Sequence, residues 1–322
     1  MTAAPARLLL VGDAGYGAFD LRGQRLDGSD PVLGALRAWA TTTSPTAVLF
    51  LGDNVYGRRP RVPRNYGALA PGADWEAVVR DEAGGLESSQ LLDQLAVAQA
   101  GVPTWFLLGN HDWSRGAAGV LAQRTLIETY AAHHAVDLEL LPATEGPLHG
   151  PSDLAGQVSV RTVGSSIGIV AIDTEAGMQA PDACLGLRNR LWDAVSSLQT
   201  DVVVVAGHHP VRSLGPHGRR RRSTIFTRQD IPARRYRSYI ERVLHPPHGY
   251  RPSRPVFYAS GHEHQLQAIE PGPWKGFDRL FISGAGSRSQ VRPGGAVSHE
   301  TDGIENYDGS WWSSDGSDVL DL

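Results

Sequence analysis

The sequence predicts an α/β fold in which two packed sheets and their flanking helices form one domain. Short apolar runs with strand character alternate with helical patterns in both halves of the chain. The loops that follow these runs carry Asp, Asn and His in both halves, so the halves share one candidate site. With 322 residues and 41% hydrophobic content, the chain can bury a sizeable core, and we expect a single domain over residues 1–322.

Charge and composition exclude several classes of protein. The formal net charge of −4 gives no overall field that attracts nucleic acid, and the one cysteine, Cys184, cannot form an intrachain disulfide. No stretch approaches the ~18 apolar residues of a membrane span. The N-terminal residues show no export signal, so a cytoplasmic protein is expected.

Helix and strand signals alternate through the first half. A helix is expected to start after Asp30, which is a favourable N-cap residue and is followed by proline. Gly101 and Pro103 end a second helical pattern. The strands expected here are Leu8–Gly12, Ala47–Leu51 and Thr104–Leu108, and the helices are Asp30–Ala40, Leu86–Ala100 and Leu121–His133.

The second half opens with a hairpin signal, in which Gly164 lies between two apolar strands. Four consecutive valines, Val202–Val205, lack period-two alternation, which predicts a strand buried on both faces. Inserts rich in Arg and Pro lie near residues 57–74 and 218–250, close to the loops of the predicted site. The other strands expected are Gln157–Thr162, Ile167–Ile172, Pro255–Ser260 and Arg279–Ser283, and the helices are Leu185–Leu198 and Tyr236–Leu244.

Five of the predicted strands end in the same way, with glycine followed by Asp, Asn or His. In open α/β sheets, ligands bind at the carboxyl ends of the strands. One such junction could be a turn, an N-cap or a surface histidine, but five together predict a polynuclear metal site at one sheet edge. The junctions are Gly12-Asp13, Gly52-Asp53-Asn54, Gly109-Asn110-His111-Asp112, Gly207-His208-His209 and Gly261-His262-Glu263-His264.

The donor atoms indicate two transition-metal ions. Two ions ~3.5–4 Å apart need a bridging carboxylate, and Asp53 at a tight turn is the natural bridge. Asn110 offers a carbonyl oxygen, and His208, His262 and His264 offer imidazole nitrogens. Imidazole suits Fe, Zn or Mn better than Ca or Mg.

In this order, the five junctions resemble the motifs of the calcineurin-like metallophosphoesterase superfamily. Many members carry a histidine where this chain has Gly15, and Tyr56 can supply the missing ligand. The Gly-Asp-Asn-x-Tyr run that ends at Tyr56 resembles the purple acid phosphatase loop, and later stretches resemble the tartrate-resistant enzymes and bacterial calcineurin-like phosphoesterases. The resemblance implies an αββα sandwich of two mixed sheets flanked by helices, and a metal-dependent phosphoric ester hydrolase.

The same resemblance implies Fe(III) in the first position and divalent Fe, Zn or Mn in the second. A phenol of pKa about 10 ionises near pH 7 only on a strongly Lewis-acidic cation, which fits Fe(III) at Tyr56. The alternative is a tyrosine that only packs beside the site. The implied ligands are Asp13, Asp53, Tyr56 and His264 for the first ion, and Asp53, Asn110, His208 and His262 for the second.

Further roles around the metal ions follow from this resemblance. A metal-bound hydroxide would be the nucleophile and His111 the general acid, with Asp112 fixing the tautomer and orientation of His111. His217 matches a second substrate-facing histidine. The candidate substrate contacts are His209, Trp113, Arg115 and Arg212, although His209 and Trp113 could equally pack within their loops.

The favoured function is a phosphomonoesterase of purple acid phosphatase type that acts on a phosphorylated small molecule. A phosphodiesterase or nucleotide hydrolase on the same metal site is the alternative. A non-catalytic scaffold is less favoured, because no implied ligand is missing and His111 is present. No nucleic-acid partner is expected, since the net charge is negative and few aromatic residues lie among the basic ones.

Overall fold

The computed structural model describes residues 6–16, 31–42, 46–56, 86–144, 146–213, 239, 242–250, 252–269, 276–286 and 304–307. The insert near residues 57–74 and most of the one near 218–250 lie outside the described residues, as does His217. Within the described part, no helix is long and apolar enough to cross a bilayer.

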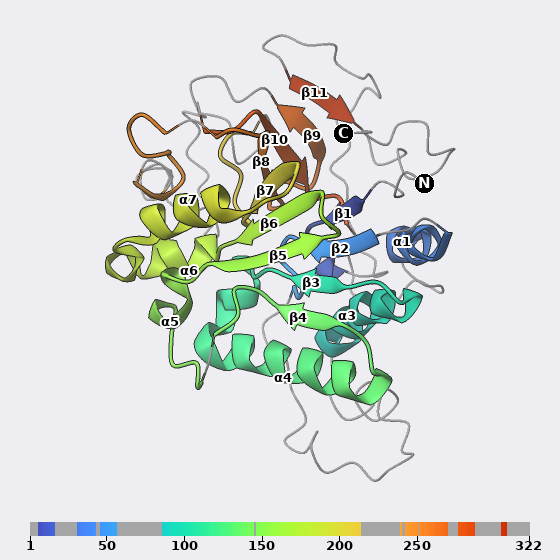
Figure 1. Ribbon diagram of the computed structural model, residues 1–322. Helices are drawn as coiled ribbons and strands as arrows, with labels where there is room; N and C mark the ends of the chain where they lie inside the picture. Colours follow the sequence, from blue (N-terminus) through green and yellow to red (C-terminus); the bar gives the residue numbers. More distant parts are fainter. Residues whose placement is uncertain are drawn as a thin grey trace, which may run out of the picture.

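The strands form two sheets, which Figure 1 shows one above the other. The smaller sheet is parallel throughout and has the order β1 (Arg7–Val11), β2 (Thr46–Phe50), β3 (Thr104–Phe106) and β4 (Leu138–Leu140). The larger sheet has the order β11 (Ile304–Tyr307), β9 (Leu266–Ile269), β10 (Arg279–Ser283), β8 (Val256–Ser260), β7 (Val202–Ala206), β6 (Ile167–Ala171) and β5 (Ser159–Val163). It is mixed, because β5 and β9 run antiparallel to their neighbours.

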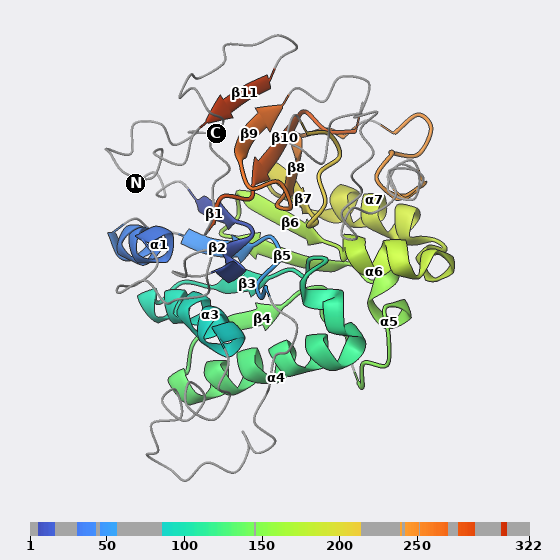
Figure 2. The same ribbon diagram turned by 180° about the vertical axis from the view of Figure 1, so that it is seen from behind.

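Three hydrophobic layers hold these sheets in an αββα sandwich. The central layer lies between the sheets and contains Leu49 and Phe257. The second lies between the smaller sheet and helices α1 (Pro31–Thr42), α3 (Leu86–Leu95) and α4 (Gly116–His134). The third packs α7 (Leu187–Ser197) against the larger sheet through Trp192. Figure 2 shows α3 and α4 on the side of β3 and β4, away from the larger sheet. The predicted sandwich is confirmed.

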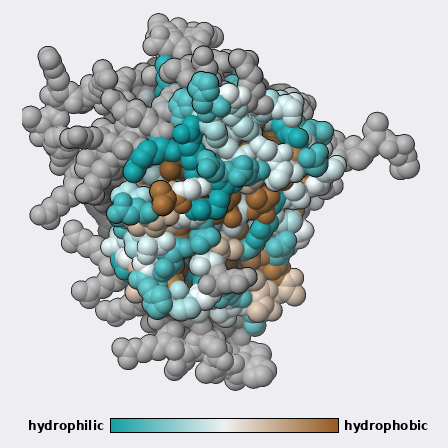
Figure 3. All heavy atoms as spheres, turned by 60° about the vertical axis from the view of Figure 1, so that its left-hand side comes forward, coloured by the Kyte–Doolittle hydropathy of each residue, from teal (hydrophilic) through white to brown (hydrophobic). Residues whose placement is uncertain are grey.

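The central strands are buried on both faces, as the run of valines predicts. In β7, Val203 and Val205 belong to the layer under α7, whereas Val204 and Ala206 belong to the central layer. Successive side chains of a strand point to opposite faces, so a strand between two apolar layers must be apolar at every position. On the side that carries α6 and α7, hydrophobic surface residues form patches between hydrophilic ones (Figure 3).

Most predicted elements are present with small shifts at their ends. The hairpin around Gly164 is confirmed, and β5 and β6 pair antiparallel. Helix α4 starts at Gly116 rather than at Leu121, and α3 gives way to a 3₁₀ helix after Leu95. The elements that were not expected are β4, β9, β11, α5 (Ser152–Ala155) and α6 (Thr174–Gln179). All five are short, so they show too few periods of a hydrophobic pattern to be recognised.

Candidate metal centre

The five predicted junctions follow the carboxyl ends of β1, β2, β3, β7 and β8, and their loops meet at one end of the sandwich. Backbone hydrogen bonds join the loops directly. The amide of Asp13 donates to the carbonyl of Gly52 across 3.0 Å, and the amide of Gly261 donates to the carbonyl of His208 across 3.0 Å. Residues 39 and 53 positions apart in the chain are therefore held side by side.

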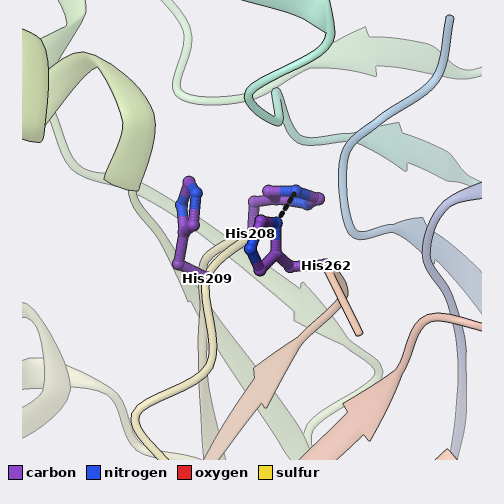
Figure 4. A group of neighbouring side chains, drawn as sticks. All are labelled: His208, His209 and His262. Carbon is purple, nitrogen blue, oxygen red and sulfur yellow. Dashed lines mark hydrogen bonds between the residues drawn. The ribbon is translucent and has the colours of Figure 1, made fainter. Parts of the chain in front are cut away.

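Three donor atoms from three loops converge in one cluster. Asn110 Oδ1 lies 3.1 Å from His208 Nε2 and 3.0 Å from His262 Nδ1, and the two nitrogens are 3.3 Å apart. Figure 4 shows the two imidazoles next to each other, with a dashed line at this contact, and their planes are nearly perpendicular. His208 Nδ1 lies 2.8 Å from the carbonyl of Leu51. In the neutral imidazole, Nδ1 would donate to this carbonyl, which leaves the Nε2 lone pair directed at the cluster. Converging lone pairs of this kind suit a cation, and donor separations of ~3 Å fit metal–ligand bonds of ~2.0–2.2 Å.

A second cluster forms around the phenol of Tyr56. Its oxygen donates to Asp13 Oδ1 across 2.8 Å and lies 3.2 Å from His264 Nε2, which is itself 3.6 Å from Asp13 Oδ1. The other oxygen of Asp13 accepts the backbone N–H of His262 at 2.7 Å. One carboxylate, one phenol and one imidazole thus point at a common position.

Asp53 lies between the two clusters. Its Oδ1 is 3.4 Å from His208 Nε2 and accepts the backbone N–H of His111 at 2.8 Å. Ligand atoms of Asp13, Asp53 and His208 all lie within 4.8 Å of one another. This is the place that a carboxylate shared between two ions requires.

The electrostatics of the pocket favour positive charge. Asp13, Asp53 and His208 are almost completely buried. Burial away from water raises the pKa of Asp13 to about 8; His208 opposes this rise, and the neighbouring carboxylate of Asp53 adds to it. Burial also acts to raise the pKa of Asp53, but His208 and then His111 hold it below its usual range. For His208, burial opposes the charged form, yet Asp53 and Asp13 raise its pKa to about 10.

Three of the candidate ligands have a backbone conformation that is rare outside glycine. Asp13, Asp53 and His262 have φ values of 60°, 55° and 69°. Left-handed conformations at such residues cost free energy and concentrate at functional sites. Together with the converging donors, these angles indicate a dinuclear metal site built by all five loops.

A family model described as calcineurin-like phosphoesterase matches residues 6–266 of the chain. The chain belongs to this family. No curated protein matches it. Several solved structures resemble it distantly, with sequence identities of 16% or less.

A structure of PhoD is 16% identical in sequence to this chain and has a TM-score of 0.45. The match covers 87% of this chain and 56% of the PhoD chain. Purple acid phosphatase PPD1 from yellow lupin (Lupinus luteus) seeds has 11% identity, with 91% and 47% covered and a TM-score of 0.48. The NAD nucleotidase of Haemophilus influenzae has 16% identity, with 88% and 45% covered and a TM-score of 0.34. The chain therefore spans only about half the length of these proteins.

In this calcineurin-like phosphoesterase, the first loop has no room for a side chain at position 15. A Cβ on Gly15 would lie 2.5–2.6 Å from backbone atoms of residues 53–55. The amide of Gly15 also donates to the carbonyl of Asp53 across 3.0 Å. Because the two loops touch at this point, a histidine could not occupy position 15, and Tyr56 fills the space beside Asp13.

His111 lies next to the Tyr56 cluster, with the two rings 4.3 Å apart. The expectation that Asp112 orients His111 is wrong. The Asp112 carboxylate instead accepts backbone N–H groups of Gly109 at 2.8 Å, Asn54 at 3.1 Å and Val55 at 3.2 Å. Asp112 therefore joins the loops after β2 and β3, which carry two of the candidate ligands.

The expected substrate contacts differ in exposure. Trp113 is 3% exposed, belongs to the core beside α4, and donates its indole N–H to Asp173 at 2.8 Å, so it has no face open for stacking on substrate. His209 is 2% exposed and lies against α6, as its packing alternative requires. Arg115 and Arg212 are partly buried.

Sequence reasoning missed one segment near the centre, Asp173–Glu175. Asp173 caps α6 by accepting the N–H of Ala176 at 2.8 Å, and Thr174 and Glu175 face His209. The signal was available, because Asp173 follows the strand predicted at Ile167–Ile172, but no glycine precedes it. This junction therefore lacks the glycine that marks the other five.

Proposed function

We propose that the chain is a metal-dependent phosphoric ester hydrolase, and specifically a phosphomonoesterase of purple acid phosphatase type. The observation that supports this type is the position of the Tyr56 oxygen, 2.8 Å from Asp13 Oδ1 and 3.2 Å from His264 Nε2. A tyrosine that only packed beside the site would not direct its oxygen at two other candidate ligands. The substrate class proposed is a phosphorylated small molecule.

The two donor clusters support a proposed residue set for each ion. Fe(III) would be held by Asp13, Asp53, Tyr56 and His264, since carboxylate and phenolate oxygens suit a trivalent cation. Divalent Fe, Zn or Mn would be held by Asp53, Asn110, His208 and His262. When bound, such ions would supply Lewis acidity, which lowers the pKa of water and neutralises charge on phosphoryl oxygens.

His111 is the residue of the chain best placed to donate a proton to the leaving group. Its backbone is anchored by the bond from its amide to Asp53, and its ring packs on Tyr56. Both contacts keep the imidazole at the edge of the metal centre, where it is partly exposed. A proton donor matters most for a leaving group of high pKa, such as an alkoxide.

The experiment compares substrates of the enzyme loaded with iron and zinc. We expect nitrophenyl phosphate to be hydrolysed with a kcat/KM at least ~10-fold above that of the bis-nitrophenyl ester. Equal or faster hydrolysis of the diester would make the phosphodiesterase the better assignment, and cleavage of single-stranded DNA would point to a nuclease.

His111→Ala tests the proton donor on the same preparation. The variant should lose ~10²–10⁴-fold in kcat on an alkyl phosphate, whose leaving group needs the proton, and much less on nitrophenyl phosphate. Equal losses on both substrates would contradict the role. His133→Ala, on the exposed face of α4, is the matched control and should keep the wild-type rates.

A further inference from the structure

His209 follows the candidate ligand His208 directly, yet its ring faces the start of α6 rather than an open pocket. Nδ1 lies 2.8 Å from the hydroxyl of Thr174, and Nε2 lies 3.5 Å from a carboxylate oxygen of Glu175. Both partners belong to the first turn of α6. One short helical segment therefore hydrogen-bonds one nitrogen of the imidazole and faces the other with a carboxylate.

Further contacts fix the position of the backbone around His209. The hydroxyl of Thr174 also accepts the backbone N–H of His209 at 3.2 Å, and the phenol of Tyr258 donates to its carbonyl at 2.7 Å. The close approach depends on Gly207, where a Cβ would lie 2.6 Å from Thr174 Cγ2 and 2.9 Å from the phenol oxygen of Tyr258. The end of β7 and the start of α6 are thus packed with no space between them.

Glu175 is itself held in place. Its Oε1 accepts the side-chain N–H of Gln179 at 2.7 Å, one turn later on α6. Among the residues that the structure describes, the other oxygen is buried without a hydrogen-bond partner, and it lies 3.5 Å from His209 Nε2. A buried carboxylate is costly unless a positive or polar group faces it, and His209 provides that group.

The ring of His209 packs against two candidate ligands of the second ion. Its centroid lies 4.6 Å from that of His262 and 4.9 Å from that of His208. Figure 4 shows the three side chains together. His262 has a left-handed backbone, with φ of 69°. A ligand on a strained backbone needs neighbours that limit its movement, and the His209 ring packs beside the His262 ring in this way.

We propose that Thr174, Glu175 and His209 form a positioning unit that sets the affinity of the second metal ion. The proposal rests on the proposed function, because it concerns the ion assigned there to Asp53, Asn110, His208 and His262. Thr174 and Glu175 act through His209, and His209 acts through the imidazoles of His208 and His262. Thr174 and Glu175 have no other role in the site, and the burial of His209 favours packing over its candidate role as a substrate contact.

The test measures metal binding rather than turnover. Metal-free protein is titrated with Zn²⁺ alone by calorimetry, and His262→Ala identifies the binding step of the second ion. Thr174→Val removes the hydroxyl but keeps the shape of the side chain. We expect this variant to lower the affinity of the second binding step ~10–100-fold, because loss of a hydrogen-bond partner behind a metal ligand generally has this effect. The affinity of the first step should stay within ~3-fold of the wild type.

Two further variants sharpen the comparison. Thr174→Ser restores the hydroxyl and should return the second step to within ~3-fold of the wild type. Glu175→Gln removes the charge beside His209 and should also weaken the second step. Glu139→Gln is its matched control, because it removes a carboxylate from the ion pair with Arg161, which joins β4 to β5.

Wild-type affinity for both ions in Thr174→Val and Glu175→Gln would overturn the proposal, as would equal weakening of the two steps. Circular dichroism melts show whether each variant folds, and if Thr174→Val does not, Glu175→Gln decides. Hydrolysis of nitrophenyl phosphate by the wild type is measured separately. If the wild type binds two ions but hydrolyses no ester, the proposed function is contradicted. The ranking of the variants by their affinity for the second ion would still stand.

Discussion

The phenol oxygen of Tyr56 donates a hydrogen bond to Oδ1 of Asp13 across 2.8 Å, although 43 residues separate the two in the chain. The loops after β1 and β2 touch at Gly15, where a Cβ would lie 2.5–2.6 Å from backbone atoms of residues 53–55, and Tyr56 lies beside Asp13 close to this contact. In the proposed assignment, a tyrosinate ligand at this position would favour Fe(III) over a second divalent ion.

Tyr56→Phe tests this assignment directly. The wild type loaded with iron should show a visible band from tyrosinate-to-iron charge transfer, and the variant should lose the band together with most of its iron. Because a ligand is removed, iron affinity should fall by more than ~100-fold. Visible spectra and metal analysis provide the measurement. A colourless wild type with two zinc ions would remove Fe(III) from the assignment while sparing the hydrolase.

Asp112→Asn tests the observed role of this carboxylate. Asparagine places an amide NH₂ where one carboxylate oxygen now accepts N–H groups. This NH₂ and the buried backbone N–H groups of Gly109 or Asn54 are all donors, so they could not hydrogen-bond to each other. Urea unfolding should show a loss of ~2–4 kcal/mol, from one or two broken charged hydrogen bonds. Unchanged stability together with a displaced acid limb of the pH–rate profile would favour an orienting role toward His111 instead.

Asp173 should make stability depend on pH. Burial raises its pKa to about 7, and although the N–H groups of Ala176 and Trp113 act against this rise, nearby Glu175 adds to it. The folded-state pKa lies above the unfolded value of 3.8. Asp173 therefore contributes fully to the stability of the fold below pH 3.8, and this contribution is lost as the pH rises through 7.

Asp173→Asn removes this titration while keeping an oxygen that can cap α6. The stability of the wild type relative to the variant should therefore fall between pH 4 and pH 8, by a total on the order of 4 kcal/mol. Urea unfolding at several pH values measures it. Asp193→Asn, at an exposed position of α7, is the control. A difference that stayed constant across this range would contradict the prediction.

Trp113→Phe keeps the aromatic ring but deletes the N–H that Asp173 accepts. The unfolding free energy should fall by ~1–3 kcal/mol, because a buried acceptor loses its partner. KM should change by the same factor for an alkyl and an aryl phosphate, since a buried indole cannot stack on the leaving group. A selective rise for the aryl ester would restore Trp113 as a substrate contact.

Much of the fold could be predicted because its strands are buried between apolar layers. The four valines of β7 and the hairpin at Gly164 give strong periodic or turn signals, and both are confirmed. The meeting of the loops after β1, β2, β3, β7 and β8 followed from a general property of open α/β sheets, whose carboxyl ends gather ligands.

The direction of individual side chains was harder to predict. Asp112 and His111 are adjacent in sequence, which suggested a pair, but the 3₁₀ helix that begins at Asp112 carries its carboxylate toward Asn54 and Val55. Trp113 lies two residues beyond His111 and is nevertheless part of the core. Contacts of this kind depend on a few backbone angles, for which the sequence has no periodic signal.

The candidate ligands come from strands of both sheets, so ions bound there would fasten the two layers together at one end. Anything that binds only the folded arrangement adds its binding free energy to the stability of that arrangement. Loading of the ions and assembly of the sandwich would then be one coupled equilibrium. A chain stripped of ions would keep the apolar middle of the sandwich and loosen first at this end, so a cell short of iron or zinc would hold it in a more protease-sensitive form.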